Sequence, residues 1–504
     1  MIRSIALLCF AFVFACGGTR APEGQVPPLE PALETPEQAP VVEAEPIPAP
    51  PSGPARDISF PRIERSTLSS GLEVNVVRSS ALPTLHLRLV IRSGAEADPE
   101  GREGLSSLVA EMLREGTRRR TSAEIAERIE FLGADLGTGA DEENLFLTFR
   151  CLSEHLEAAL EILAELVTEP AFRDDELAKL KRRETDRLAL VGQQPRWLAR
   201  RELNRRLYGE DHPYGTVDTT VEALGRTTRN DLVRWHRTYV VPNNAFLVVV
   251  GDATAAQVQA AATSAFGRWR RRNVRIRALP DVPTRDAREV VVVDRPGSAQ
   301  STIFVANLAI ARRDPAFIAL DVANQVLGGS AASRLFMDLR ERRSLTYGAY
   351  SDVGERVGVA PFVALASVRT AVTGQAMDGL MEHLNRIVAE APSDEEVQNA
   401  TTYLSDSFPL QIATPSRIAW MVANLRIFDL PDDYWDGYRT AIRNTTPANA
   451  LAAAQAHIQP NEALVVVVGT AAEIAEDLRR FGPVLVVDME GEEKQRLTAV
   501  SASE

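Results

Sequence analysis

The hydrophobic and polar positions of this chain repeat the same order of elements. Apolar runs of strand length occupy Glu73–Val77 and Leu85–Ser93, and an amphipathic stretch of helix length follows at Gly104–Leu113. These lengths and periodicities predict a pair of strands followed by a helix. The same succession returns at Glu289–Asp294, Thr302–Ala309 and Pro315–Leu327.

A second repeat supports the first. The segment Pro242–Gly251 (PNNAFLVVVG) returns 218 residues later as Pro460–Gly469 (PNEALVVVVG). Together the repeats predict an α+β fold made of two homologous halves, each an antiparallel sheet with helices. We place the halves at 58–269 and 289–488 and the linker between them at 270–288. Val484–Val487 is predicted as a last edge strand, and 489–504 as an acidic, frayed tail.

The stretch Leu327–Tyr350 (LGGSAASRLFMDLRERRSLTYGAY) is the most distinctive local pattern. After a Gly-Gly-Ser break it predicts a helix ending at Arg340, with Tyr347 starting an extended run seven residues later. Its apolar side consists of Leu335, Phe336 and Leu339, and Arg334, Arg340, Arg342 and Arg343 surround the rest. An Arg and a Tyr at such a corner could donate hydrogen bonds to a peptide carbonyl. Locally, an Arg favoured by the helix dipole beside a strand-capping Tyr explains the same residues.

Length and charge narrow the class of protein. A chain of 504 residues with 45% hydrophobic content is long enough for more than one domain with a sizeable core. The formal charge of −13 argues against a general nucleic-acid binder. We interpret the arginine clusters at Arg118–Arg120 and Arg268–Arg277 as solvated loop and linker charge.

The N-terminal region is predicted to be an export signal followed by a tether. Residues 1–16 combine Arg3, an apolar run at Ile5–Ala15 and Cys16, in the manner of a bacterial lipoprotein signal; an ordinary secretory signal is the alternative. Residues 17–57 hold eleven of the thirty prolines and many glutamates, which predicts a disordered tether. A lipidated Cys16 would leave Cys151 as one buried thiol. We expect a lipid anchor at the periplasmic face of the outer membrane.

The Leu327–Tyr350 pattern, the repeat and the segment Leu207–Gly215 together resemble the insulinase/pitrilysin family of zinc peptidases, the inverzincins. The resemblance covers residues 60–485. It implies a clam-shell of two halves around a chamber that takes unfolded peptides. It also implies that Arg340 and Tyr347 contact the peptide near the scissile carbonyl. The family's substrate-pairing edge strand corresponds to Leu145–Phe149.

The family's zinc-binding helix carries H-x-x-E-H, in which two histidines bind zinc and the glutamate activates water. Aligned on this chain, the two histidines correspond to Ser107 and Glu111, and the glutamate corresponds to Ala110. The third ligand is expected near Asp186–Leu188, with Glu184 close but off register. The six histidines are scattered, no two within five residues of each other. We therefore expect no zinc and no other cofactor in this chain, which on its own is not a peptidase.

Three functions remain. The first is a non-catalytic, substrate-binding subunit that forms a heterodimer with a zinc-bearing homologue and acts on unstructured peptides. The second is a scaffold without peptidase activity, and the third is an independent peptide-binding lipoprotein. The retained Arg340 and Tyr347 favour the first over the second, and only the partner distinguishes the first from the third.

Overall fold

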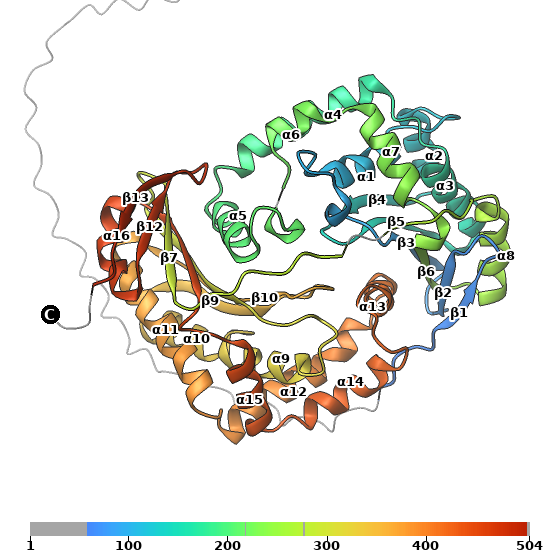
Figure 1. Ribbon diagram of the computed structural model, residues 1–504. Coiled ribbons are helices and arrows are strands. Elements are labelled where there is room, and N and C mark those ends of the chain that lie inside the picture. Colours follow the sequence, from blue (N-terminus) through green and yellow to red (C-terminus); the bar gives the residue numbers. More distant parts are fainter. Residues whose placement is uncertain (1–57, 217, 276–277, 501–504) are drawn as a thin grey trace, which may run out of the picture. The chain divides into compact units, whose positions relative to one another are not determined.

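The computed structural model describes residues 58–216, 218–275 and 278–500. The predicted signal at 1–16, Cys16 and the tether at 17–57 lie outside these ranges. Both halves of the repeat lie within a single compact unit of the chain. Each half contains its own sheet, labelled with its helices in Figure 1.

The first half is built on a six-stranded sheet with the order β1-β2-β6-β3-β5-β4. Its strands are β1 (Glu64–Thr67), β2 (Glu73–Arg78), β3 (Thr84–Ile91), β4 (Asp135–Ala140), β5 (Leu145–Leu152) and β6 (Ala245–Gly251). Its helices are α1 (Leu105–Arg114), α2 (Ser122–Phe131), α3 (Leu156–Thr168), α4 (Asp174–Val191), α5 (Pro195–Tyr208), α6 (Val221–Arg226), α7 (Arg229–Tyr239) and α8 (Ala255–Phe266). Helices α1, α3, α7 and α8 share one core with the sheet, in which Cys151 is a buried free thiol.

The second half is built on a seven-stranded sheet with the order β13-β12-β7-β11-β8-β10-β9. Its strands are β7 (Glu289–Asp294), β8 (Gln300–Leu308), β9 (Thr346–Val353), β10 (Pro361–Arg369), β11 (Leu464–Gly469), β12 (Val484–Val487) and β13 (Glu493–Leu497). Its helices are α9 (Phe317–Leu327), α10 (Arg334–Phe336), a π-helical turn (Met337–Arg342), α11 (Thr373–Ala389), α12 (Asp394–Gln411), α13 (Pro415–Ile427), α14 (Tyr434–Arg443), α15 (Pro447–His457) and α16 (Ala471–Leu478).

The α+β class with two halves is confirmed, but the sheets are mixed rather than antiparallel. The predicted strand pairs do not pair with each other, because β6 lies between β2 and β3, and β11 lies between β7 and β8. Strand β6 is parallel to β2, and β11 is parallel to β7. Long helical connections precede β6 and β11, and such crossovers permit the parallel pairing that a hairpin excludes.

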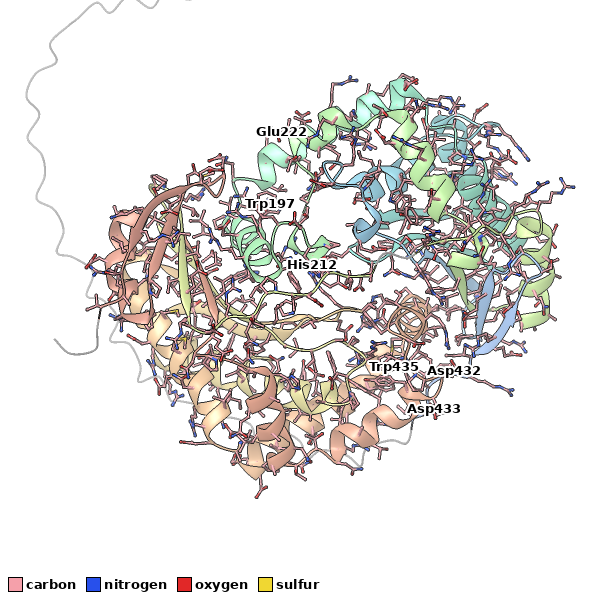
Figure 2. All side chains as sticks on the ribbon, in the orientation of Figure 1. Trp197, His212, Glu222, Asp432, Asp433 and Trp435 are labelled. Atoms are coloured by element: carbon pink, nitrogen blue, oxygen red, sulfur yellow. The ribbon has the colours of Figure 1, made fainter. Side chains whose placement is uncertain are left out.

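The two halves exchange helices. Helix α5 belongs to the first half by sequence, yet its Leu198, Leu203 and Leu207 pack on the second sheet. Helix α13 belongs to the second half, yet Ile418 and Val422 pack on the first sheet. Figure 2 shows Trp197 on α5 and, near α13, Trp435, whose indole donates a hydrogen bond to the Met421 carbonyl at 3.2 Å. Both faces of each sheet are therefore covered, and the central strands β6 and β11 are buried along their whole length.

The C-terminal segment differs from the prediction. Val484–Val487 forms a strand as expected, but it is not the edge, because Glu493–Leu497 pairs with it as β13. A turn at 488–492 makes this possible: the Asp488 carboxylate accepts the backbone N–H groups of Glu490 and Glu492. The part of the predicted tail at 493–497 is an edge strand whose charged side chains are exposed, a composition that edge strands favour.

The exchange predicts that one leucine of α5 stabilises a sheet from which it is distant in sequence. Leu203 is 1% exposed, and Leu203→Ala is expected to lower the free energy of unfolding by about 2–4 kcal/mol. Chemical denaturation followed by tryptophan fluorescence measures this. The control is Leu190→Ala on α4, where the side chain is 72% exposed and little change is expected. An equal effect of the two substitutions would refute the packing role of α5.

Candidate functional site

Helix α1 holds the positions that correspond to the family's zinc motif. Its apolar residues face the first core, and a carboxylate on the preceding loop caps it: Asp98 accepts the backbone N–H groups of Gly104 and Ser106 at 3.0 and 2.9 Å. Burial raises the pKa of Asp98 to about 8 in spite of these bonds. Gly104 has a φ of +84°, and a Cβ there would lie 2.5 Å from that of Thr219, so glycine lets this loop approach the helix.

The three motif positions point in different directions. Ser107 is exposed and Glu111 is half-buried, and both line a pocket of about 300 Å³. Ala110 is fully buried in the core. The position that corresponds to the family's general base is therefore a methyl group without access to water.

A residue of α4 completes the same pocket. Glu184 lines it together with Ser107 and Glu111. In the range Asp186–Leu188, where the third ligand was expected, only Arg187 lines the pocket, since Asp186 is exposed and Leu188 is packed in the core. The helical period of 3.6 residues places Glu184 and Arg187, three apart, on the face that lines the pocket.

An arginine lies among the carboxylates of this pocket. Arg187 donates to Glu184 at 2.6 Å and makes two bonds to Asp218, at 2.9 and 2.7 Å. The hydrogen bonds with Asp218 are the main reason that the pKa of Arg187 is raised. Burial raises the pKa of Glu111, and the charge of Glu184 adds to this increase. The Arg187 guanidinium thus offsets part of the negative charge of the three carboxylates in the pocket.

The donor set of the pocket does not fit zinc. It offers the hydroxyls of Ser107 and Thr219 and three carboxylates but no imidazole, and Glu184 is already bonded to a guanidinium. Within residues 58–216, 218–275 and 278–500, no group of three His, Cys, Asp or Glu side chains is placed to hold a metal ion.

The edge strand β4 forms another wall of the pocket. Gly139 and Ala140 line it, and β4 pairs only with β5. The expectation that Leu145–Phe149 forms the free edge is wrong, since β5 is paired on both sides, with β3 and with β4. Phe146 of β5 lies against Gly139, where a Cβ would come within 2.8 Å of its ring. The outer backbone groups of β4 are thus the ones available to an extended peptide.

Arg340 lies in a π-helical turn rather than at the end of a regular α-helix. The helix that begins at Arg334 continues as the π-helical turn Met337–Arg342, so the predicted end at Arg340 is wrong. Arg340 lies over the Phe336 ring at 4.8 Å and is 3.4 Å from Glu341. Arg334, expected among the arginines around the helix, is instead buried and makes two bonds to Glu396.

Tyr347 projects from a β-bulge at the edge of the second sheet. Residues 347–348 of β9 lie opposite Ser367 alone, and the Thr346 hydroxyl donates to the Ser367 carbonyl at 2.6 Å. Bulges re-aim side chains, and Tyr347 is 88% exposed. Among the described residues, no contact joins Tyr347 to Arg340. Neither residue lines the α1 pocket.

A set of contacts that we call the clasp holds the β4–β5 hairpin. It is made by Glu142, Glu143 and Tyr214 of the first half and by Arg356 and Val357 of the second. Arg356 donates to Glu142 at 2.9 Å and lies over the Tyr214 ring at 4.3 Å. Glu143 accepts the Val357 N–H at 2.6 Å and the Tyr214 hydroxyl. No sequence pattern predicted the clasp, because its members are far apart along the chain.

The motif that carries Tyr214 is a capped turn. His212, labelled in Figure 2, accepts the backbone N–H of Tyr214 on its Nδ1 at 3.0 Å. Burial lowers the pKa of His212, so the imidazole is suited to accept this bond. This histidine is therefore structural.

A two-sheet fold with a peptidase-type helix α1 that has lost its metal ligands defines the class of this protein. The model of "Insulinase (Peptidase family M16)" matches residues 74–216, and that of "Peptidase M16 inactive domain" matches residues 226–404. The chain belongs to the insulinase family, peptidase family M16.

Relatives and a solved structure agree with this assignment. An uncharacterized zinc protease of Streptomyces coelicolor is 20% identical over 68% of this chain and 76% of its own length. A protein of Helicobacter pylori described as a non-peptidase homolog is 23% identical over 66% of this chain and 77% of its own. The crystal structure of a peptidase M16 inactive domain from Pseudomonas fluorescens matches with a TM-score of 0.76 and 26% identity, over 81% of this chain and 98% of that one. Together with residues 107, 110 and 111, these matches indicate a non-catalytic member of the family.

Arg187 is expected to reduce the electrostatic repulsion between the carboxylates of the pocket. Arg187→Met removes the charge and leaves Glu184 and Asp218 without their guanidinium partner. Because these groups are partly exposed, we expect a loss of about 1–2 kcal/mol in the free energy of unfolding. Urea denaturation measures this. Arg183→Met, which removes an arginine that is 57% exposed and pairs with Glu115, is the control and should cost less. If Asp218→Asn restores none of the loss in the Arg187→Met background, the coupling is absent.

The clasp is expected to weaken as pH rises. Burial raises the pKa of Glu143 from 4.5 to about 7, although the Tyr214 and Val357 bonds oppose the shift. A raised carboxyl pKa contributes stability that is present below pH 4.5 and is lost as pH rises through 7. Because the side chain is half-buried, we expect this change to be about 1–2 kcal/mol. The difference in melting temperature between the wild type and Glu143→Gln, measured from pH 4 to 9, should fall between pH 4.5 and 7 and level off above 7. A flat difference would exclude Glu143 as the titrating group.

Proposed function

We propose that this chain is the substrate-binding, non-catalytic subunit of a two-chain metallopeptidase, and that it acts with a zinc-bearing homologue on unstructured peptides. The observation that carries the proposal is the free edge of β4 beside a pocket in which Arg187 pairs with Glu184 and Asp218. A peptide can bind at this edge, but the motif positions hold no zinc-ligand set, and the buried Ala110 stands where the family has its general base. The bond-breaking step therefore belongs to the partner.

The edge strand offers the means of binding. An extended peptide that pairs with β4 gains backbone hydrogen bonds irrespective of its sequence, so its recognition is broad. Gly137 and Gly139 carry no side chains that would obstruct a neighbouring strand. The clasp holds the hairpin in place, which reduces the entropy lost when a peptide orders along it.

Arg340 and Tyr347 supply the side-chain donors. The Tyr347 hydroxyl forms no hydrogen bond within the described residues, and Arg340 makes an ion pair with its neighbour Glu341 and lies over the Phe336 ring. Both can therefore donate to peptide carbonyls without breaking a strong internal contact. This availability favours peptide binding over a purely structural role.

Location follows from the N-terminal residues. We propose export and lipid attachment at Cys16, which places the subunit and its partner on the same side of a membrane. None of the helices in the described ranges is long and apolar enough to span a membrane. Metabolic labelling with a fatty acid in wild type and Cys16→Ser tests the attachment.

A peptidase assay tests the proposed division of roles. A quenched unstructured peptide is incubated with this chain, with the zinc-bearing homologue from the same cell, and with both, in the presence and absence of a chelator. We expect chelator-sensitive cleavage only with both chains. Cleavage by this chain alone contradicts the proposal, and no cleavage in any mixture favours a scaffold or an independent binding protein.

Substitutions in the same assay test the two donors. Arg340→Ala should raise the KM for the peptide about 10- to 100-fold, the range expected for a lost charge-assisted hydrogen bond. Tyr347→Phe should raise it about 2- to 10-fold, because only a neutral donor is removed. Arg342→Ala is the matched control, since Arg342 is on the same turn and is 67% exposed. Unchanged kinetics for Arg340→Ala would exclude its role in binding.

A further inference from the structure

A broad groove lies on the helical side of the first half, outside the proposed peptide site. It has a volume of about 1160 Å³, and its walls come from α3, α7, the end of α8 and the segments at 118–120 and 268–272. Nine arginines line it against three glutamates, which leaves a local charge of +6 in a chain whose net charge is −13. Such a local reversal of sign focuses a positive potential in the groove.

The groove joins two arginine clusters that the sequence separates by about 150 residues. Arg118 belongs to the first cluster and Arg272 to the second. Their positive charges both lower the pKa of His236, although burial is the larger cause, and this pKa falls to about 4. The interpretation of these clusters as solvated loop and linker charge is therefore incomplete, because folding brings them to one groove.

Three of the arginines are held by the protein itself. Arg119 makes two bonds to Glu169, at 2.9 and 2.6 Å, and Arg120 pairs with Glu165. Arg229 donates to the carbonyl groups of Phe172 and Ala171. The other six are exposed, and within the described residues their guanidinium groups form neither an ion pair nor a hydrogen bond: Arg118, Arg128, Arg237, Arg268, Arg270 and Arg272.

We propose that this groove is a binding site for a ligand that carries several closely spaced phosphate groups. Guanidinium groups bind phosphate oxygens through two parallel N–H donors, and several such groups along one groove suit several phosphates. The aromatic residues of the groove, Phe172 and Trp269, are buried at 2% and 8% exposure. They offer no ring on which bases can stack, which disfavours single-stranded nucleic acid. The proposal is independent of the peptide-binding role.

Binding of inorganic tripolyphosphate to the full chain tests the site. Isothermal titration at low ionic strength compares the wild type with the triple substitution Arg237→Ser, Arg268→Ser and Arg270→Ser. We expect at least a tenfold weaker affinity in the variant and a decline of wild-type affinity with added salt. The control removes the same charge from exposed arginines elsewhere: Arg196→Ser, Arg200→Ser and Arg313→Ser. It should change the affinity less than twofold. Because all six side chains are exposed, both variants should fold, and melting temperatures check this.

Further arms identify the source of the phosphates. Co-sedimentation with vesicles of phosphatidylglycerol in phosphatidylcholine, competed by tripolyphosphate, assigns the site to lipid headgroups. Binding of tripolyphosphate without binding to vesicles assigns it to a free phosphate compound. The proposal is overturned if neither probe binds, if both triple variants lose equal affinity, or if polyglutamate or an oligonucleotide binds more tightly than tripolyphosphate.

Discussion

Each sheet of this protein is apolar on both faces, and the other features of the fold depend on that constraint. In the first sheet, Val74 and Val76 face one core while Val77 and Val250 face another. A half that supplied only its own helices would leave the second face of its sheet in water, at a cost of about 25 cal/mol for each Å² of apolar surface. The exchange of α5 and α13 removes this exposure and makes each half part of the other's core.

The same exchange positions the candidate site. Helix α5 ends at Tyr208, whose hydroxyl donates to the Val359 carbonyl of the second half at 2.8 Å. The turn that follows carries Tyr214 to Glu143, next to the edge strand β4. The free edge is therefore fixed by residues of both halves, and helix packing, hairpin geometry and peptide access are linked through one segment.

The sequence predicted the fold class well, because valine-rich runs such as Val290–Val293 and their repeat depend on local periodicity. Strand order was not predictable in the same way. The position of β6 between β2 and β3 depends on which crossover connection covers which face of the sheet. In the site, Ser107 and Ala110 followed from alignment with a motif. Glu184 was named as close to the expected third position but off register, and a shift of a few residues on a helix changes the face. Arg187 carried no motif signal, and its role depends on its distance from Asp218, which only the folded chain defines.

The internal repeat gives the two sheets equivalent edges, and the residues on these edges differ in chemistry. Strands β4 and β9 occupy equivalent places. β4 lies beyond β5, which pairs with β3, and β9 lies beyond β10, which pairs with β8. In β4 the residues are small, with Gly137 and Gly139 leaving the backbone accessible. In β9 a bulge interrupts the ladder and turns Tyr347 outward. One edge is suited to pairing with a strand and the other to presenting a side-chain donor. Two copies of one architecture thus supply complementary parts of the proposed peptide-binding surface, even though the first copy holds no zinc-ligand set at its motif positions.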